Sequence, residues 1–141
     1  MIFAAMPLGL RTISLCAVLG IPSATVGQSM PSAPDPVRGA RMFLQCRACH
    51  TVTPGGANIV GPNLAGIFEA KAATRPGYVY SSALTQSGLV WTVPALDRFL
   101  TRPNQAVRGN KMVYAGMPDA RSRSDVVAYL KTLKAGPNGR P

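Results

Sequence analysis

Acidic side chains are scarce in this sequence. Asp and Glu account for five of its 141 residues, against 15 Lys and Arg, which gives a formal net charge of +10. A basic balance of this kind is typical of nucleic-acid-binding proteins, but the basic residues are scattered and form no continuous run. We therefore expect no nucleic acid partner and interpret the charge as a positive surface that attracts an acidic protein.

Hydrophobic runs long enough to span a membrane are also missing. The apolar run at residues 12–21 has half of the roughly 20 residues that a bilayer requires. Arg11 precedes this run, and Pro22 and small residues follow it, an order that is typical of a secretory signal peptide. We predict a signal peptide at residues 1–27 and a disordered leader at 28–36. An uncleaved N-terminus that anchors the protein in a membrane is the alternative.

Histidine and cysteine, the usual nitrogen and thiolate ligands of metals, are few. The chain has one histidine, His50, and three cysteines, of which Cys16 lies in the expected signal peptide. A structural zinc site needs four ligands, and Cys46, Cys49 and His50 supply three. A thioredoxin-like dithiol would follow a buried strand, and the sequence before Cys46 has no strand pattern. Both of these sites are therefore disfavoured.

The few cysteines and the histidine nevertheless form one continuous pattern. Cys46-Arg47-Ala48-Cys49-His50 is the signature of c-type haem attachment. At this spacing each thiol can add to one vinyl group of the same porphyrin, and the imidazole that follows lies beneath the ring with a nitrogen facing the iron. We predict one covalently bound haem c, with His50 as a ligand to the iron.

Strand patterns and internal repeats are absent, and the helical patterns are short. Asp35 and Pro36 are a suitable N-cap and first residue for a helix that leads into the haem motif. Thr92 predicts the start of a second helix, which Pro103 is expected to end.

A terminal helix is expected after residues 122–125, where Ser122 and Asp125 have the spacing of a capping box, with Gly136 after its C-terminus. Glycine and proline divide residues 51–92 into loops, and these loops can pack on a haem. We predict an all-α domain at residues 37–136, with short helices and long loops around one covalent haem, and a flexible tail at 137–141.

A haem with one histidine ligand has either a second ligand or an open site. Met112 lies in a glycine-flanked loop, residues 109–116, that can cross the ring without distorting a helix. Met117 precedes Pro118 at the start of the terminal helix and is interpreted as an apolar filler. We favour Met112 as the second ligand, with lysine and water as the other candidates.

Together these motifs resemble the class I c-type cytochromes, in particular the mitochondrial cytochrome c type and its soluble bacterial relatives. The resemblance runs from about Gly39 to Leu133. Its motifs are Cys46-Arg-Ala-Cys-His50-Thr-Val, Gly61-Pro62-Asn63-Leu64-x-Gly66, Tyr80, Trp91, Asn110-Lys111-Met112 and Asp125-Val-Val-Ala-Tyr129-Leu130.

The resemblance implies the cytochrome c fold and a role for each matching residue. Cys46 and Cys49 would hold the haem, and His50 and Met112 would ligate its iron. The Pro62 carbonyl would accept a hydrogen bond from the other ring nitrogen of His50.

Three aromatic contacts follow from the same resemblance. Tyr80 and Trp91 would donate to a buried haem propionate; a role as simple core aromatics is the alternative for both. Phe43 of the first helix would pack on Tyr129 of the last, where Gly39 allows a close approach.

Some positions depart from the family pattern. Phe99 stands where the family usually has a tyrosine near the methionine sulfur, and Ala70 replaces an arginine that helps to neutralise a propionate. Leu84 replaces an asparagine of a buried water network. Lys111 remains from the ring of lysines that often surrounds the haem edge, so docking to a standard oxidase or reductase is not assumed.

The resemblance implies a soluble, monomeric, periplasmic electron carrier and not an enzyme. It would take electrons from a quinol-linked complex or a dehydrogenase and pass them to an oxidase or reductase, through acidic docking surfaces on those partners. Peripheral contact with a membrane is left open. The alternatives are a haem enzyme or gas-binding sensor with a displaceable methionine, and a dedicated cytochrome subunit of a periplasmic dehydrogenase complex.

Overall fold

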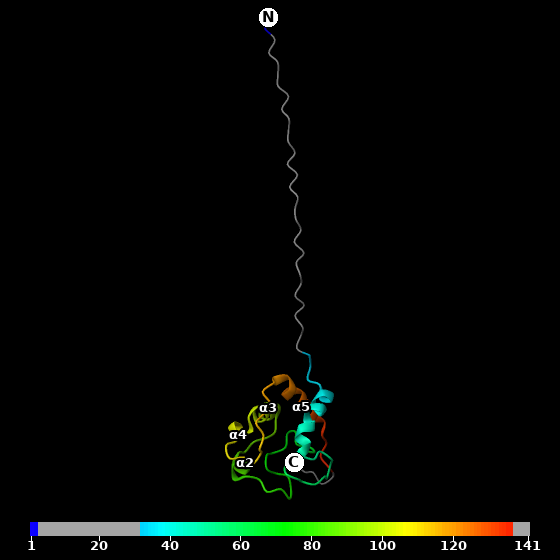
Figure 1. Ribbon diagram of the computed structural model, residues 1–141, viewed down its shortest axis with the longest axis vertical. Coiled ribbons are helices and arrows are strands. Elements are labelled where there is room, and N and C mark those ends of the chain that lie inside the picture. Colours follow the sequence, from blue (N-terminus) through cyan, green and yellow to red (C-terminus); the bar gives the residue numbers. More distant parts are fainter. Residues whose placement is uncertain (3–31, 137–141) are drawn as a thin grey trace. The chain divides into compact units, whose positions relative to one another are not determined.

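The computed structural model describes residues 1–2 and 32–136 (Figure 1). The expected signal peptide, apart from its first two residues, lies outside the described residues, as do the expected tail at 137–141 and the first part of the expected leader. The elements, in chain order, are α1 (Pro36–Met42), the 3-10 helix η1 (Phe43–Ala48), α2 (Ser82–Gln86), α3 (Val93–Thr101), α4 (Pro103–Ala106) and α5 (Ala120–Thr132).

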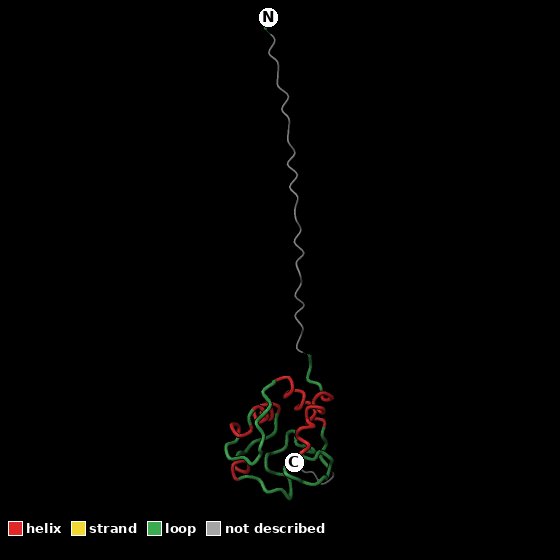
Figure 2. Tube along the Cα trace, in the orientation of Figure 1, coloured by secondary structure: helices red, strands yellow, loops and turns green. Residues whose placement is uncertain are grey.

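Loops join these short helices, and no strand is drawn among the described residues (Figure 2). The one sheet-like pairing in this part of the chain is an isolated antiparallel bridge between Lys71 and Val90. The predicted all-α architecture is therefore confirmed. Within the described ranges, no helix is long and apolar enough to cross a membrane.

The first and last helices cross at Gly39, as predicted. A Cβ atom on Gly39 would lie 1.9 Å from the carbonyl oxygen of Asp125 and 2.9 Å from the Cβ of Tyr129, so only glycine permits this approach. One turn further on, the rings of Phe43 and Tyr129 pack with their centroids 5.2 Å apart. Phe43 is 2% exposed, and the crossing therefore fixes the position of η1, which follows α1 directly.

A buried carboxylate joins the two ends of this fold. Asp125 of α5 accepts from the backbone N–H of Asp35 at 2.7 Å and from Nε of Arg38 at 2.8 Å, while its own side chain is 3% exposed. The bond from Arg38 is the largest of the effects that hold the pKa of Asp125 below its ordinary value of 3.8. Asp125 therefore stabilises the fold as a carboxylate.

Acid is expected to weaken this connection. Because the folded-state pKa of Asp125 is lowered, its contribution is complete above the ordinary value of 3.8 and is lost as the pH falls through the folded-state value. Asp125→Asn should lower the free energy of unfolding by roughly 2 kcal/mol at neutral pH and reduce its decline in acid. Urea unfolding followed by circular dichroism from neutral pH downward checks this, with the exposed Glu69→Gln as control. An equally steep acid decline in Asp125→Asn would contradict the assignment.

The terminal helix begins earlier than predicted. Its N-cap is Asp119, whose carboxylate accepts from the N–H of Ser122 at 2.6 Å. The predicted capping box of Ser122 and Asp125 is wrong, because Asp125 is a buried partner of Arg38. Gly136 is not the residue after the helix either, since α5 ends at Thr132 with Leu133 as its C-cap.

Two further helices were not expected. As predicted, α3 ends just before Pro103, at Thr101. Pro103 is also the first residue of α4, a position where the fixed φ of proline is favourable. Within the segment expected to be loops, the Ser81 hydroxyl caps α2 by accepting from the N–H of Leu84. The rest of residues 51–92 is irregular, apart from the Lys71–Val90 bridge.

The main cluster of buried apolar residues comes from η1, α3, α5 and the segments next to α3 and α4. Its members are Phe43, Trp91, Leu96, Phe99, Leu100, Val107, Met117, Val126, Val127 and Leu130. Several members of this cluster also line the cavity described in the next subsection, so the core supports one wall of that cavity.

Candidate functional site

All seven predicted site residues line one cavity. Its volume is about 270 Å³, and its lining is predominantly apolar. The predicted residues among the lining are Cys46, Cys49, His50, Pro62, Tyr80, Trp91 and Met112. Segments far apart in the sequence therefore meet at a single site.

The haem motif enters the cavity from the end of η1. The N–H groups of Cys49 and His50 both donate to the carbonyl of Cys46, at 3.0 and 2.9 Å, which closes a tight turn. No disulfide joins Cys46 to Cys49, and both side chains are of intermediate exposure, so both sulfurs can form thioether bonds. Burial, and to a lesser extent the neighbouring Cys49, raises the pKa of the Cys46 thiol to about 11. Such a thiol is mostly protonated at neutral pH, which is unlike the activated thiol of a redox dithiol.

His50 is held in one tautomer by the loop that follows. Its Nδ1 lies 2.8 Å from the carbonyl oxygen of Pro62. A carbonyl only accepts, so Nδ1–H donates and the lone pair of Nε2 is free to bind a metal. Burial lowers the pKa of His50, while the bond to Pro62 opposes that shift. The ring is therefore presented as a neutral imidazole, the form that ligates iron.

Gly61 keeps the backbone close to the face of this ring. A Cβ atom at this position would lie 2.4 Å from Cε1 and 2.7 Å from Nδ1 of His50. The same residue donates its N–H to the carbonyl of Cys49 at 2.7 Å, so the backbone has little freedom to move away.

Gly61→Ala is therefore expected to displace the imidazole. We expect the yield of haem-loaded protein to fall severalfold, since a change in such a supporting position typically costs about 10–100-fold in metal affinity or activity. The measurement is the ratio of haem absorbance to protein in purified samples. Gly77→Ala is the control: an added Cβ would lie 3.7 Å from its nearest neighbour, Nδ2 of Asn58, and its φ of +71° costs alanine about 1–2 kcal/mol without any contact to His50. An equal loss in both variants would contradict the role given to Gly61.

Met112 lines the cavity from the loop between α4 and α5. Its N–H donates to the side-chain oxygen of Asn110 at 2.8 Å, and the amide nitrogen of Asn110 donates to the carbonyl of Val107 at 2.8 Å. Asn110 therefore holds the start of the loop. Met117, at the other end, is 6% exposed within the core, which confirms its interpretation as an apolar filler.

Aromatic residues form another part of the wall. Trp91 is 7% exposed and packs edge-on against Phe99, with ring centroids 5.0 Å apart. Tyr80 is half-buried beside Tyr78, with ring centroids 4.8 Å apart. Burial is the main cause that raises the pKa of Tyr80, so its hydroxyl is a neutral donor at physiological pH.

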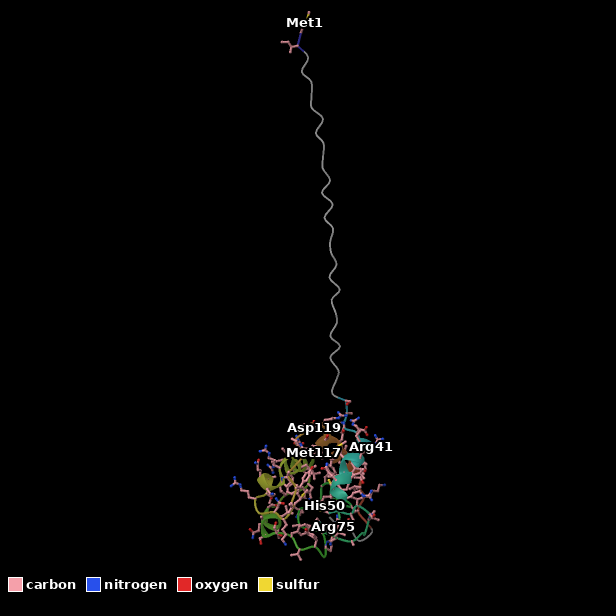
Figure 3. All side chains as sticks on the ribbon, in the orientation of Figure 1. Met1, Arg41, His50, Arg75, Met117 and Asp119 are labelled. Carbon is pink, nitrogen blue, oxygen red and sulfur yellow. The ribbon has the colours of Figure 1, made fainter. Side chains whose placement is uncertain are left out.

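Arg75 was missed by the sequence reasoning. Its guanidinium donates through Nε to the carbonyl of Asn63 at 3.0 Å and through a terminal nitrogen to the carbonyl of Ala65. It lines the same cavity as His50, and Figure 3 labels both residues in the same part of the molecule. None of the ion pairs in the described part of the chain includes Arg75, so the cavity contains a cation without a carboxylate partner.

The sequence contains no signal that could have found Arg75. Ala70 suggested that the cavity lacks an arginine, and only the path of the irregular loop brings Arg75 there. Taken together, the donors fit a haem c. Two thiols and an imidazole come from one turn, a thioether comes from another loop, and a cation lies in an apolar cavity that would receive carboxylates.

Comparisons with known proteins agree with this chemistry. The family model described as Cytochrome c matches residues 36–134. Cytochrome c2 of Rhodomicrobium vannielii is 43% identical over 101 residues, which cover 72% of this chain and 81% of that protein. Cytochrome c2 of Rhodopila globiformis is 45% identical over 106 residues, covering 73% and 99%.

A solved structure extends the comparison to the fold. Cytochrome cH from Methylobacterium extorquens matches with a TM-score of 0.66 and 41% sequence identity, over 70% of this chain and 98% of that one. The match of the family model, residues 36–134, includes the haem motif and all the helices of the described domain. This chain belongs to the cytochrome c family, as a class I c-type cytochrome with a covalently bound haem c.

Proposed function

We propose that the protein carries single electrons between redox partners, through an iron ligated by His50 and Met112. The observation that supports this most is the convergence of an oriented imidazole and a methionine on one cavity. Haem c, when bound, supplies the iron that is oxidised and reduced by one electron. The chain's own part is to hold the ligands and to exclude water.

Different residues of the cavity have different roles in this function. The Pro62 carbonyl orients His50, and Asn110 positions the backbone of Met112. Methionine together with histidine raises the reduction potential of the iron. We further propose that Tyr80 and Trp91, with the cation of Arg75, receive the propionates.

Exposed apolar side chains contribute to the mouth of the cavity. Val60 and Val113 line it and are 73% and 100% exposed. Three hydrogen bonds join the segments around the mouth. They run from the Tyr78 hydroxyl to the Val60 carbonyl, from Lys111 Nζ to the Val79 carbonyl and from the Tyr114 hydroxyl to the Gln45 side chain. A partner would therefore make apolar contact at the mouth, while the positive charge acts over a longer range.

Two small oxidants of opposite charge test electron transfer at this mouth. We expect the reduced protein to give up one electron per haem to either oxidant. The rate with anionic ferricyanide should fall as salt is added, and the rate with a cationic cobalt(III) tris-phenanthroline complex should rise, because salt screens attraction and repulsion alike. Salt-independent rates with both would contradict a positive surface around the mouth.

The partners and location follow as proposals. We propose a periplasmic carrier that is reduced by a quinol-linked complex or dehydrogenase and oxidised by an oxidase or reductase with an acidic docking surface. A fixed subunit of a dehydrogenase complex would perform the same chemistry, and copurification with a dehydrogenase would identify that case.

A gas-binding sensor or haem enzyme is the second candidate. Phe99 supports it, because this phenyl ring packs on Trp91 and offers the methionine side of the cavity no hydroxyl. Carbon monoxide added to the reduced protein at neutral pH separates the two functions. Binding at micromolar gas would favour the sensor, and no spectral change would favour the carrier.

A further inference from the structure

We infer that Arg123, paired with Asp97, holds the C-terminal end of the loop that carries Met112 and so limits how often Met112 leaves the iron. The methionine loop is defined here as residues 107–119, between α4 and α5. The inference rests on the ligation by Met112 proposed above, and it assigns to Arg123 a positioning role.

Arg123 is an unusual residue for the first turn of a surface helix. Its side chain is 11% exposed, whereas that of its partner Asp97 on α3 is 46% exposed. Nε donates to the Asp97 carboxylate at 2.7 Å. Burial of a guanidinium is costly unless its donors are satisfied, so the remaining contacts explain its position.

Those remaining contacts are made to the methionine loop. One terminal nitrogen of Arg123 donates to the carbonyl of Met117 at 2.9 Å and to the carbonyl of Pro118 at 2.7 Å. A single guanidinium therefore joins α3, α5 and the last residues of the loop. Hydrogen bonds from a charged donor are stronger than neutral ones, and removal of Arg123 would leave the buried Met117 carbonyl without this partner.

The middle of the loop is attached mainly by exposed side-chain hydrogen bonds. Val113 is fully exposed, Lys111 Nζ donates to the Val79 carbonyl at 3.1 Å, and the hydroxyl of the partly buried Tyr114 donates to Gln45 at 3.3 Å. The loop is held chiefly at its ends, by Asn110 at one and by Arg123 at the other. Met117 also donates to the Leu100 carbonyl at 2.8 Å, so loss of Arg123 would loosen this end without releasing it completely.

Arg123 thus acts on Met112 through Met117, which lies five residues further along the chain. When the loop end is held, the thioether stays in the cavity. When it is loosened, the same covalent chain allows Met112 to withdraw more often, and a small external ligand can take its place. The proposal predicts a change in the rate of exchange at the iron that exceeds any change caused by general destabilisation.

The test is imidazole binding to the oxidised, haem-loaded protein, followed by stopped-flow absorbance. At saturating imidazole the observed rate equals the rate at which Met112 leaves. We expect Arg123→Gln to raise this rate by about tenfold or more, the effect of losing hydrogen bonds to a charged group. Asp97→Asn should raise it less, because the two bonds to loop carbonyls remain.

Arg38→Gln is the matched control. It makes the same substitution and breaks a partly buried ion pair with Asp125, but at the crossing of α1 and α5 and away from the loop. Its rate should stay within about twofold of the unaltered protein even though its stability falls. A rise in Arg38→Gln equal to that in Arg123→Gln would overturn the inference, and so would an unchanged rate in Arg123→Gln.

Two further outcomes are decisive. If Arg123→Gln yields no haem-loaded protein, Asp97→Asn decides, and an unchanged rate in that variant overturns the inference. If the unaltered protein lacks the sulfur-to-iron absorption band, the ligation by Met112 is itself wrong and the inference fails with it. That failure is seen before any variant is made, so it is distinct from a failure of the role of Arg123.

Discussion

Replacement of Met112 by alanine is expected to abolish the weak near-infrared sulfur-to-iron band of the oxidised protein. The reduction potential should fall by more than about 59 mV, the equivalent of a tenfold change in a one-electron equilibrium, because methionine ligation favours the reduced iron. The reduced variant should also bind carbon monoxide, since a coordination position becomes free. Absorption spectra of both oxidation states and a redox titration measure these effects.

Met117→Ala is the control for this result. Met117 is the other methionine of the same loop, but it lies in the apolar core. We expect Met117→Ala to lower the free energy of unfolding by about 2–5 kcal/mol and to keep the near-infrared band. A band that survives in Met112→Ala and disappears in Met117→Ala would reverse the assignment of the ligand.

Gly39→Ala is expected to produce a large loss of stability, although it adds a single carbon atom. In an unconstrained helix this change would be favourable by up to about 1 kcal/mol. At the helix crossing the new Cβ would lie 1.9 Å from the Asp125 carbonyl oxygen, so α1 and α5 must move apart. We expect a net loss of about 3 kcal/mol, at the upper end of the range for overpacking.

Denaturant unfolding of the haem-loaded protein measures this loss. Gly88→Ala is the control: its φ is +64°, and an added Cβ would have nothing within 4 Å. That variant should lose only about 1–2 kcal/mol, the cost of a left-handed conformation for alanine. Equal losses in Gly39→Ala and Gly88→Ala would mean that the close approach of the two helices contributes little.

The two predictions differ in how they could be reached. Met112 could be chosen as the candidate ligand from the sequence, because it lies in a glycine-flanked loop that can cross the haem without distorting a helix. The crossing at Gly39 was expected only through the family resemblance, and its tightness became measurable once both helices were in place. The start of α5 could not be found from the sequence, because Asp119 and Ser122 are both good capping residues. Burial of Asp125 against Arg38 decided between them.

The sequence by itself determined the chemistry that is local along the chain. Cys46, Cys49 and His50 lie within five residues, so their spacing alone specifies covalent haem, and the short helical patterns specify an all-α chain. The tertiary structure alone decided which distant residues meet. Arg75 reaches the cavity through an irregular loop, and Arg123 reaches two loop carbonyls and a carboxylate on α3. Such contacts depend on where the backbone carbonyls point after packing, and no short-range pattern encodes that direction.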